Sequence, residues 1–311
     1  MDIAISGSSG LIGRALTSAL VRDGHRVVRL VRPETGNVGR ATVAWDPRSG
    51  AIDGAGLEGV GAVVNLAGAG VGAGRWTADR KRELLRSRVE GTRLLARTLA
   101  ALETPPAVFV SGSAVGYYGD RGDRKLTESD GPGIGFLAEV ATAWEEAAAP
   151  ARDAGIRTVL LRSAHVLAPH GGLLPYLLTP FRFGLGARFG SGRQWFPWIT
   201  LEDEIGAIRF ALEQRSAQGP VNVAAPEPVT NRTFTVTLAR VLRRPAPWWA
   251  PAPVLRAMVG GERADEVLLQ SAKVVPATLT RAGFTFADPN LEPALRRLLG
   301  AVAAPAPSAV A

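Results

Sequence analysis

The sequence contains no cysteine, which excludes disulfide bonds, thiolate metal ligands and cysteine nucleophiles. Histidine is nearly as scarce: there are three, none of them paired at helical spacing, so no metal site is expected. No apolar run approaches the ~18 residues that a membrane-spanning helix needs, and the opening residues lack the basic segment of a secretion signal. We therefore expect a cytoplasmic protein without a metal centre or a membrane partner.

Lysine is also rare. Lys81, Lys125 and Lys273 are the only lysines, so arginine supplies almost all of the basic charge behind the formal net charge of +8. Nucleic-acid-binding proteins cluster such charge with exposed aromatic residues, whereas here arginine and glutamate alternate, as between residues 75 and 93. That dispersal is typical of solvated helix faces and of proteins that attract phosphate-bearing small molecules. We expect no nucleic-acid partner; nucleic-acid binding, kept as a third hypothesis, predicts an affinity that falls steeply with salt.

The 311 residues are long enough for one large domain or two intergrown ones, and 46% of them are hydrophobic. Short β-branched segments alternate with longer amphipathic segments through the first half. We expect strands at residues 3–6, 26–31, 41–45, 61–66, 107–111 and 157–161, and helices at 10–22, 77–102 and 133–154. This alternation predicts an α/β fold with a doubly wound, Rossmann-type parallel sheet and right-handed crossovers.

The pattern changes after residue 162, where proline and glycine become frequent. A helix at residues 201–214 and a strand at 220–223 are still indicated, so we expect residues 200–224 to return to the nucleotide-binding domain of residues 1–162. Residues 163–300 otherwise form a smaller, mostly helical domain on the substrate side. The last segment, residues 301–311, is small and proline-rich, which predicts a disordered tail.

A glycine-rich turn joins the first expected strand to the first expected helix. Gly7, Gly10 and Gly13 follow the spacing G-x-x-G-x-x-G, a variant of the dinucleotide-binding fingerprint. The first glycine permits the tight turn, the second lets the backbone approach a pyrophosphate, and the third allows the helix to pack on the strand. The helix N-terminus then offers unpaired N–H groups to the phosphates. The turn predicts a dinucleotide cofactor.

The end of the second strand distinguishes NAD(H) from NADP(H). An acidic residue there would bind the ribose 2′-hydroxyl of NAD(H), but the sequence has Arg32 instead. A guanidinium favours a 2′-phosphate through bidentate, charge-assisted hydrogen bonds. We therefore predict NADP(H), with NAD(H) as the second choice because Glu34 lies close by.

Further motifs resemble the extended short-chain dehydrogenase/reductase superfamily, which includes nucleotide-sugar epimerases and dehydratases. The NLAG turn (Asn65–Gly68) follows the fourth expected strand, and Ser111–Ala114 with Tyr117–Asp120 is similar to the segment after the fifth. The match also includes Leu161–Arg162 with Val166. The fingerprint and the resemblance together give these expected cofactor-binding residues: Gly7, Ser9, Gly10, Leu11, Ile12, Gly13, Arg32, Asn65, Ala67, Gly68 and Ser111.

A second set of motifs is similar to an atypical epimerase/dehydratase-like family that has a short C-terminal domain of unassigned function. These motifs are Trp45–Pro47, Arg75–Thr77, Gly190–Ile199, Ala225–Asn231 and Val275–Phe286. The resemblance covers about residues 1–300. It implies an NADP-binding, epimerase-like protein whose substrate is undefined, and superfamily members commonly form homodimers through two long helices.

The sequence departs from the superfamily at its catalytic pair, a tyrosine followed four residues later by a lysine. Residues 135–145, where the pair belongs, contain neither. The resemblance implies that Ser113 forms a hydrogen bond with a substrate oxygen. Tyr117 or Tyr118 is then either a substitute acid or an aromatic cap on the nicotinamide pocket. Arg121 is a candidate stabiliser of a phenolate, and Glu139 is either a proton acceptor or an exposed helix carboxylate.

Other candidates lie on the substrate side. His165 and His170 are either substrate ligands or structural residues. Arg193, Trp195 and Trp198 are able to stack on a ring and hold a phosphate, or to pack the two domains together.

Two functions follow from these residues. The first is an NADP(H)-dependent oxidoreductase or epimerase that acts on a small polar or nucleotide-sugar-like substrate. The second is a non-catalytic NADP(H)-binding sensor or interaction protein that kept the fold without the chemistry.

Overall fold

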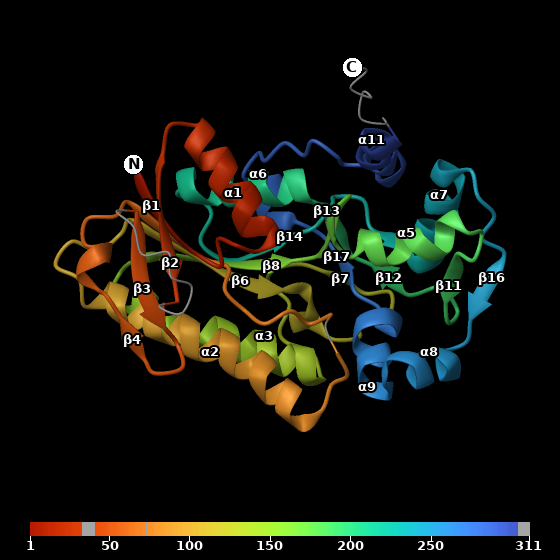
Figure 1. Ribbon diagram of the computed structural model, residues 1–311, viewed down its shortest axis with the longest axis horizontal. Helices are drawn as coiled ribbons and strands as arrows, with labels where there is room; N and C mark the ends of the chain where they lie inside the picture. The colour runs from red at the N-terminus through yellow and green to blue at the C-terminus, as the bar shows by residue number, and fades with distance from the viewer. Residues whose placement is uncertain (33–40, 73, 304–311) are drawn as a thin grey trace, which may run out of the picture.

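A computed structural model describes residues 1–32, 41–72 and 74–303. Its centre is an eight-stranded sheet in the order β14-β8-β6-β5-β1-β2-β3-β4 (Figure 1). All neighbouring strands are parallel except β3 and β4, which are antiparallel. The strands are β1 (Asp2–Ser6), β2 (Arg26–Val31), β3 (Thr42–Asp46), β4 (Ala51–Ile52), β5 (Ala62–Asn65), β6 (Val108–Ala114), β8 (Arg157–Ser163) and β14 (Gly219–Val223).

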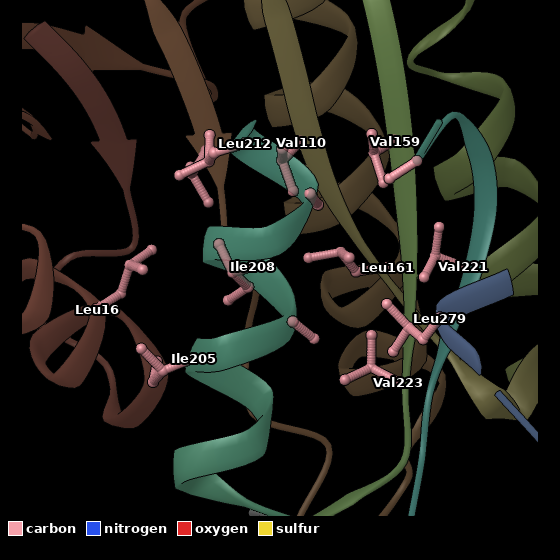
Figure 2. Close-up of a cluster of buried hydrophobic side chains, with 14 of the residues drawn as sticks. Leu16, Val110, Val159, Leu161, Ile205, Ile208, Leu212, Val221, Val223 and Leu279 are labelled. Atoms are coloured by element: carbon pink, nitrogen blue, oxygen red, sulfur yellow. The ribbon is translucent and has the colours of Figure 1, made fainter. Parts of the chain in front are cut away.

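Helices cover both faces of this sheet. One face packs against α1 (Leu11–Arg22) and α6 (Leu201–Glu213), and the other against α2 (Ala78–Ala100), α3 (Phe136–Glu146) and α4 (Ala149–Asp153). Because side chains alternate along a strand, Val110, Val159 and Leu161 point toward Ile208 of α6 (Figure 2). Their neighbours in sequence therefore point toward α2, α3 and α4. Side chains of β6 and β8 that leave the sheet on the same face are therefore the ones that can contact each other.

The remaining elements form a smaller body beside the carboxyl ends of the sheet strands (Figure 1). Short ribbons pair β7 (Lys125–Leu126) with β17 (Lys273–Val274), β9 (His165–Ala168) with β10 (Gly171–Gly172) and β13 (Trp198–Thr200), β11 (Ala187–Phe189) with β16 (Trp248–Ala250), and β12 (Trp195–Phe196) with β15 (Val229–Thr230). The helices are α5 (Leu174–Arg182), α7 (Asn231–Leu242), α8 (Ala252–Val259), α9 (Gly261–Arg263), α10 (Ala277–Arg281) and α11 (Leu291–Ala303). Phe234, Trp198 and Leu295 lie in the core of this body.

The predicted fold class is confirmed. The largest local difference concerns the expected helix over 133–154, which divides into α3 and α4. Pro150 lies in the first turn of α4, a position where its missing N–H costs nothing, so a new helix begins there. The short antiparallel edge strand β4 was not predicted from the sequence.

The region that the sequence assigned to the returning segment contains α6 and β14, which pack on and join the main sheet. Helix α11 continues to Ala303, and residues 304–311 of the expected tail lie outside the described residues. Within the described residues, no helix is both long enough and apolar enough to cross a membrane.

The order of the strands reverses between β1 and β5. In open α/β sheets, ligands bind in the crevice at the carboxyl ends of the strands at such a reversal. The candidate site should therefore lie where β1 and β5 end.

Candidate functional site

The turn between β1 and α1 is built so closely that two of its residues must be glycine. Gly7 has a φ of +68°, and a Cβ on it would lie 2.7 Å from the carbonyl carbon of Leu66. A Cβ on Gly13 would lie 2.2 Å from the oxygen of Gly7. A Cβ on Gly10 would approach that oxygen only to 3.3 Å. Gly7 and Gly13 are therefore needed by the fold, whereas Gly10 keeps the surface of the turn free of side-chain atoms.

Helix α1 begins at this turn with an uncompensated N-terminus. Gly10 is the N-cap, no side chain caps the helix, and its first turn contains no acidic residue. The first N–H groups of a helix have no partner within the helix, and the helix dipole adds a partial positive charge. A phosphate is the ligand that satisfies both.

A cleft of about 1100 Å³ opens at this N-terminus and extends over the end of β2 to the start of the β3–β4 turn. Arg14, Arg29, Arg32 and Arg48 line it. The acidic residues on its α2 wall are each paired with an arginine of the same helix, as in Asp79 with Arg82, Glu83 with Arg80 and Glu90 with Arg86. On the β2–β3 side, three arginines lie beside a single acidic lining residue, Asp46, so this is the basic side of the cleft.

Six of the expected cofactor-binding residues line this cleft: Gly7, Ser9, Gly10, Arg32, Ala67 and Gly68. Five others do not, namely Leu11, Ile12, Gly13, Asn65 and Ser111. Glu34, which was expected to soften the preference for NADP(H), lies outside the described residues. The sequence reasoning missed Ser8, Arg14 and Arg48, which also line the cleft.

Asn65 supports the NLAG turn from below. Its side chain is buried, accepts a hydrogen bond from Ser6 Oγ at 2.5 Å and donates one to Thr92 Oγ1 at 2.7 Å. Trp144 Nε1 of α3 donates to the same Thr92 oxygen at 2.9 Å. This network ties β1, β5, α2 and α3 together directly beneath the turn.

A second buried network lies at the ends of β6 and β8. Ser113 Oγ donates to Glu145 Oε1 at 2.6 Å, and Arg162 donates to both carboxylate oxygens of Glu145 at 2.8 and 2.9 Å. All three side chains are almost completely buried. Burial opposes the charge of Arg162, but the hydrogen bonds and charge of Glu145 outweigh it and hold the pKa of Arg162 above its ordinary value. Glu145 was not anticipated from the sequence.

Tyr118 belongs to the core of this network. It is fully buried, its hydroxyl accepts from Arg162 Nη1 at 2.9 Å, and it lies 2.7 Å from Asn222 Oδ1 and 3.0 Å from Thr127 O. Burial raises the pKa of Tyr118 to about 12, although Arg162 and Asn222 partly oppose the shift. The phenol therefore remains protonated and fully hydrogen-bonded, which fits a structural role better than the expected catalytic one.

Tyr117 is placed differently, although both tyrosines lie in the short 3₁₀ turn η3 (Val115–Tyr118). Tyr117 is only partly buried, and its ring lies over the guanidinium of Arg162, with 3.5 Å between Cζ and the ring centroid. Among the described residues its hydroxyl has no hydrogen-bond partner. Tyr117 is therefore the tyrosine that is available to a ligand.

Helix α3 carries other residues at the positions of the superfamily's catalytic tyrosine and lysine. Glu145 faces Ser113, so the residues one and two turns earlier on the same face are Ala141 and Leu137. A Cβ on Gly116 would lie 3.1 Å from Leu137 Cβ, so Leu137 lies close to the turn that contains the two tyrosines. Positions from which a tyrosine and a lysine would project therefore carry apolar side chains. Glu139, on the opposite face, is exposed, so the expectation that it accepts a proton is not supported.

Arg88 of α2 brings a cation to this region. Its guanidinium lies against the NLAG turn, where a Cβ on Gly68 would be 3.3 Å from Cζ, and 5.1 Å from the ring centroid of Trp144. Nη1 donates to Leu84 O at 3.0 Å, and no carboxylate pairs with Arg88 in the described part of the chain. Burial, with a smaller contribution from Arg80, lowers the pKa of Arg88 to about 10.

The other candidates have structural surroundings. Arg121 donates to the backbone oxygens of Tyr118 and Pro132 and so fixes a loop rather than a phenolate. His165 stacks on Phe196, and burial lowers the pKa of His165 to about 4, so the ring stays neutral. His170 is exposed.

The two tryptophans expected on the substrate side lie in different surroundings. Trp198 is buried in the C-terminal body, whereas Trp195 donates to Asp123 and lies beneath Lys273. Arg193 is exposed. Trp198 therefore packs the C-terminal body, whereas Trp195 is held by Asp123 and Lys273.

Two family models match the chain. The NAD dependent epimerase/dehydratase family matches residues 3–224, and a domain of unknown function, DUF1731, matches residues 250–298. An epimerase family protein of Mycobacterium bovis is 45% identical over 284 residues, which are 91% of this chain and 93% of that protein. These matches confirm the resemblance that the motifs indicated.

Two solved structures are similar over nearly the whole chain. Human epimerase family protein SDR39U1, crystallised with NADPH, has a TM-score of 0.88 and 35% identity, and the match covers 96% of this chain and 99% of the human one. A nucleoside-diphosphate sugar epimerase from Corynebacterium glutamicum has a TM-score of 0.79 and 36% identity, over 97% of this chain and 58% of the other.

Proposed function

Because the chain belongs to the NAD dependent epimerase/dehydratase family, we propose that it is an NADP(H)-dependent oxidoreductase or epimerase that acts on a small polar or nucleotide-sugar-like substrate. One observation carries the proposal: the side-chain-free turn at the N-terminus of α1 opens into a cleft whose β2–β3 side is arginine-rich. A dinucleotide with an extra phosphate complements both features.

The basic side of the cleft supports NADP(H) over NAD(H). Arg32 lies at the end of β2, where the adenosine ribose binds in this fold, with Arg14, Arg29 and Arg48 around it. A guanidinium recognises a phosphate bidentately. The related human protein was crystallised with NADPH, which agrees with this assignment.

The nicotinamide half of the cofactor belongs on the other side of the strand reversal, over β5, β6 and β8. When bound, the nicotinamide ring supplies or accepts a hydride. Ser113 and Tyr117 lie at the strand ends on this side, Ser113 as a hydroxyl oriented by Glu145 and Tyr117 as an unengaged phenol. We assign Tyr117 the transfer of a proton to or from the substrate oxygen. Ser113 donates its own proton to Glu145, so we assign it a hydrogen bond accepted from a substrate hydroxyl.

Arg88 supplies the positive charge that the missing lysine would have supplied. Its half-buried guanidinium has one backbone acceptor and no carboxylate partner among the described residues, so its remaining N–H groups suit ligand oxygens. Perturbed ionisable groups gather at functional sites because ligands compensate their charge there. The lysine of the superfamily binds the hydroxyls of the nicotinamide ribose, and we assign the same hydroxyls to Arg88.

The roles of Arg32 and Arg88 are tested separately with two ligands, one of which lacks the nicotinamide half of the cofactor. Binding of NADPH and of adenosine 2′,5′-bisphosphate is measured by calorimetry for the wild type, Arg32→Gln, Arg88→Gln and the control Arg97→Gln, an exposed arginine on α2. Arg32→Gln should weaken both ligands by about tenfold or more. Arg88→Gln should weaken NADPH alone, because the bisphosphate lacks the nicotinamide half. If the wild type binds neither ligand saturably, the proposed function fails.

A non-catalytic NADP(H) sensor is the second candidate, and one observation favours it: Leu137 and Ala141 occupy the α3 face that points toward Ser113. It predicts saturable NADPH binding without turnover in a broad screen: carbonyls with NADPH and alcohols with NADP⁺ should leave the NADPH absorbance unchanged, and nucleotide sugars should give no epimer by chromatography. Turnover of one substrate that depends on Tyr117 would exclude it.

A further inference from the structure

Most of the large apolar side chains that the structure exposes lie on two segments of the C-terminal body. We call this surface the apolar end; it consists of Tyr176, Phe183, Leu185, Trp248, Trp249, Val254 and Met258. Its elements, α5, β11, β16 and α8, lie together at one end of the molecule (Figure 1). Trp248 and Trp249 are 57% and 58% exposed and Phe183 is 78% exposed. Rings of this size are normally buried in a soluble protein.

Backbone contacts bring the two segments of the apolar end together. Strand β11 pairs with β16, with Ala187 opposite Trp248 and Arg188 opposite Trp249. Trp248 Nε1 donates to Gly184 O at 3.2 Å, which places its ring between Phe183 and Leu185 along the chain. Helix α8 begins two residues after β16 and carries Val254 and Met258 one turn apart. Trp248 and Trp249 follow each other in β16, so their rings lie on opposite faces of the ribbon. The exposed apolar side chains are therefore gathered around both faces of this one ribbon and the helices next to it.

The same part of the chain contains no acidic residue. Residues 164–201 and 228–261 include no aspartate or glutamate. Two of their arginines form ion pairs, Arg240 with Glu292 and Arg256 with Asp265. The others form no ion pair with any residue that the structure describes. Arg188 lies in β11 itself, and the rest lie on the elements next to the ribbon: Arg182, Arg193, Arg232, Arg243 and Arg244. The apolar end is thus bordered by uncompensated positive charge.

We propose that the apolar end binds the surface of an anionic lipid bilayer. Tryptophan and tyrosine prefer the level of the headgroups, aliphatic side chains enter the acyl boundary, and arginine attracts anionic headgroups. A contact of this kind needs no membrane-spanning helix. The expectation of no membrane partner rested on the absence of such a helix and did not address a peripheral contact.

The charge and the composition of the surface disfavour other occupants. A second copy of this chain in a two-fold contact would place the same unpaired arginines against each other. Single-stranded nucleic acid would use the arginines and the aromatic rings, but it would leave Leu185, Val254 and Met258 without an apolar partner. A lipid surface satisfies the charges, the rings and the aliphatic side chains together.

Vesicle flotation tests the proposal with the full-length chain. Vesicles of phosphatidylcholine with about 30% phosphatidylglycerol are compared with pure phosphatidylcholine, in low salt and in about 0.5 M NaCl. The anionic vesicles should bind about tenfold more protein, and the excess should fall in high salt. Brominated lipid should quench tryptophan fluorescence in the wild type, but much less in a Trp248→Phe/Trp249→Phe variant that still binds.

Two double variants separate the apolar and the charged contributions. Trp248→Ser/Trp249→Ser and Arg243→Glu/Arg244→Glu should each reduce binding by about tenfold or more. The matched controls, Val21→Ser/Ile134→Ser and Arg93→Glu/Arg97→Glu, change exposed residues elsewhere and should bind like the wild type. Circular dichroism and the midpoint of thermal unfolding check that each variant is folded.

Three results would overturn the proposal. One is equal binding to both kinds of vesicle, or binding that neither double variant reduces. The second is self-association in sedimentation velocity that the Trp248→Ser/Trp249→Ser change abolishes, which would assign the surface to a second copy. The third is polyuridylate binding that is tighter than vesicle binding and is lost in the same variants.

Discussion

Glu145 accepts one hydrogen bond from Ser113 and two from Arg162, and it thereby joins the end of β6 to the end of β8 through helix α3. Ser113 and Arg162 are direct neighbours in the sheet register, so their side chains leave the sheet on the same face. Arg162 also bonds Tyr118 and lies under the ring of Tyr117. One buried carboxylate therefore orients both hydroxyl-bearing residues that the proposed chemistry uses.

The first prediction concerns the stability of this network. Glu145→Ala should lower the free energy of unfolding by about 3–5 kcal/mol, because it leaves the buried guanidinium of Arg162 without a counter-charge. The measurement is urea denaturation followed by circular dichroism. The control is Glu139→Ala on the exposed face of the same helix, which should change stability by less than about 0.5 kcal/mol. Equal losses from the two variants would show that the pair is not a structural centre.

The sequence predicted the sheet and its main helices because their signals are local. The alternation of β-branched and amphipathic segments depends only on neighbouring residues, and the fingerprint follows β1 directly. The division into α3 and α4 was missed because Pro150 permits either the end of a helix or the start of a new one.

The site could be predicted only in part. The turn and Arg32 were found, but Glu145 was not, because its partners Ser113 and Arg162 become neighbours only through the register of β6 and β8. Adjacent tyrosines in a short turn cannot be ranked from sequence, since their burial depends on the packing of α3 and β14. Arg88 did leave a signal: it lies four residues from both Leu84 and Thr92, which are buried, so the helical period places it on the inner face of α2.

A second prediction contrasts two glycines of the phosphate-binding turn. Gly10→Val should leave the fold nearly intact, since its backbone is extended and a Cβ there meets only the Gly7 oxygen at 3.3 Å. Its side chain would instead obstruct the approach of a pyrophosphate, so NADPH affinity should fall by about a hundredfold or more. Gly13→Ala should do the reverse and lower stability first, because its Cβ would lie 2.2 Å from that oxygen.

Calorimetry with NADPH and thermal unfolding are measured on both glycine variants. A Gly10→Val protein that is folded and binds NADPH like the wild type would remove the turn from the binding site. Loss of folding in Gly10→Val, with Gly13→Ala unaffected, would contradict the assignment of roles within the turn.

A third prediction concerns the pH dependence of stability. Glu204 is fully buried in α6, accepts from Ser163 Oγ at 2.7 Å, and has no partner for Oε2 among the described residues. Burial raises the pKa of Glu204 from 4.5 to about 7. The folded state thus holds a proton that the unfolded state has released. The stability from this proton is fully present below pH 4.5 and is lost as the pH rises to about 7.

Glu204→Gln lacks this ionisation, so its stability relative to the wild type should increase between pH 5 and pH 8 by up to about 3 kcal/mol. Urea denaturation of both proteins across this range gives the difference. His165, whose lowered pKa has the opposite effect on acidification, is present in both proteins and cancels. A constant difference at all pH values would show that Glu204 titrates in the folded state as an exposed carboxylate does.

The last prediction separates Tyr117 from Tyr118 and tests whether the site is catalytic. Tyr118→Phe removes a hydroxyl that bonds Arg162 and Asn222 in the buried network, so it should lower the free energy of unfolding by about 1–3 kcal/mol. Tyr117→Phe removes a hydroxyl that has no hydrogen-bond partner among the described residues, and it keeps the ring over Arg162, so its stability should match the wild type. If Tyr117 moves the proton, its variant should still bind NADPH but turn over substrate about 10²–10⁴ times more slowly.

Tyr118→Phe should therefore be the less stable of the two variants, and Tyr117→Phe the slower one. Full turnover in Tyr117→Phe would contradict the proton-transfer assignment, whereas equal stability of the two variants would contradict the burial argument on which that assignment rests.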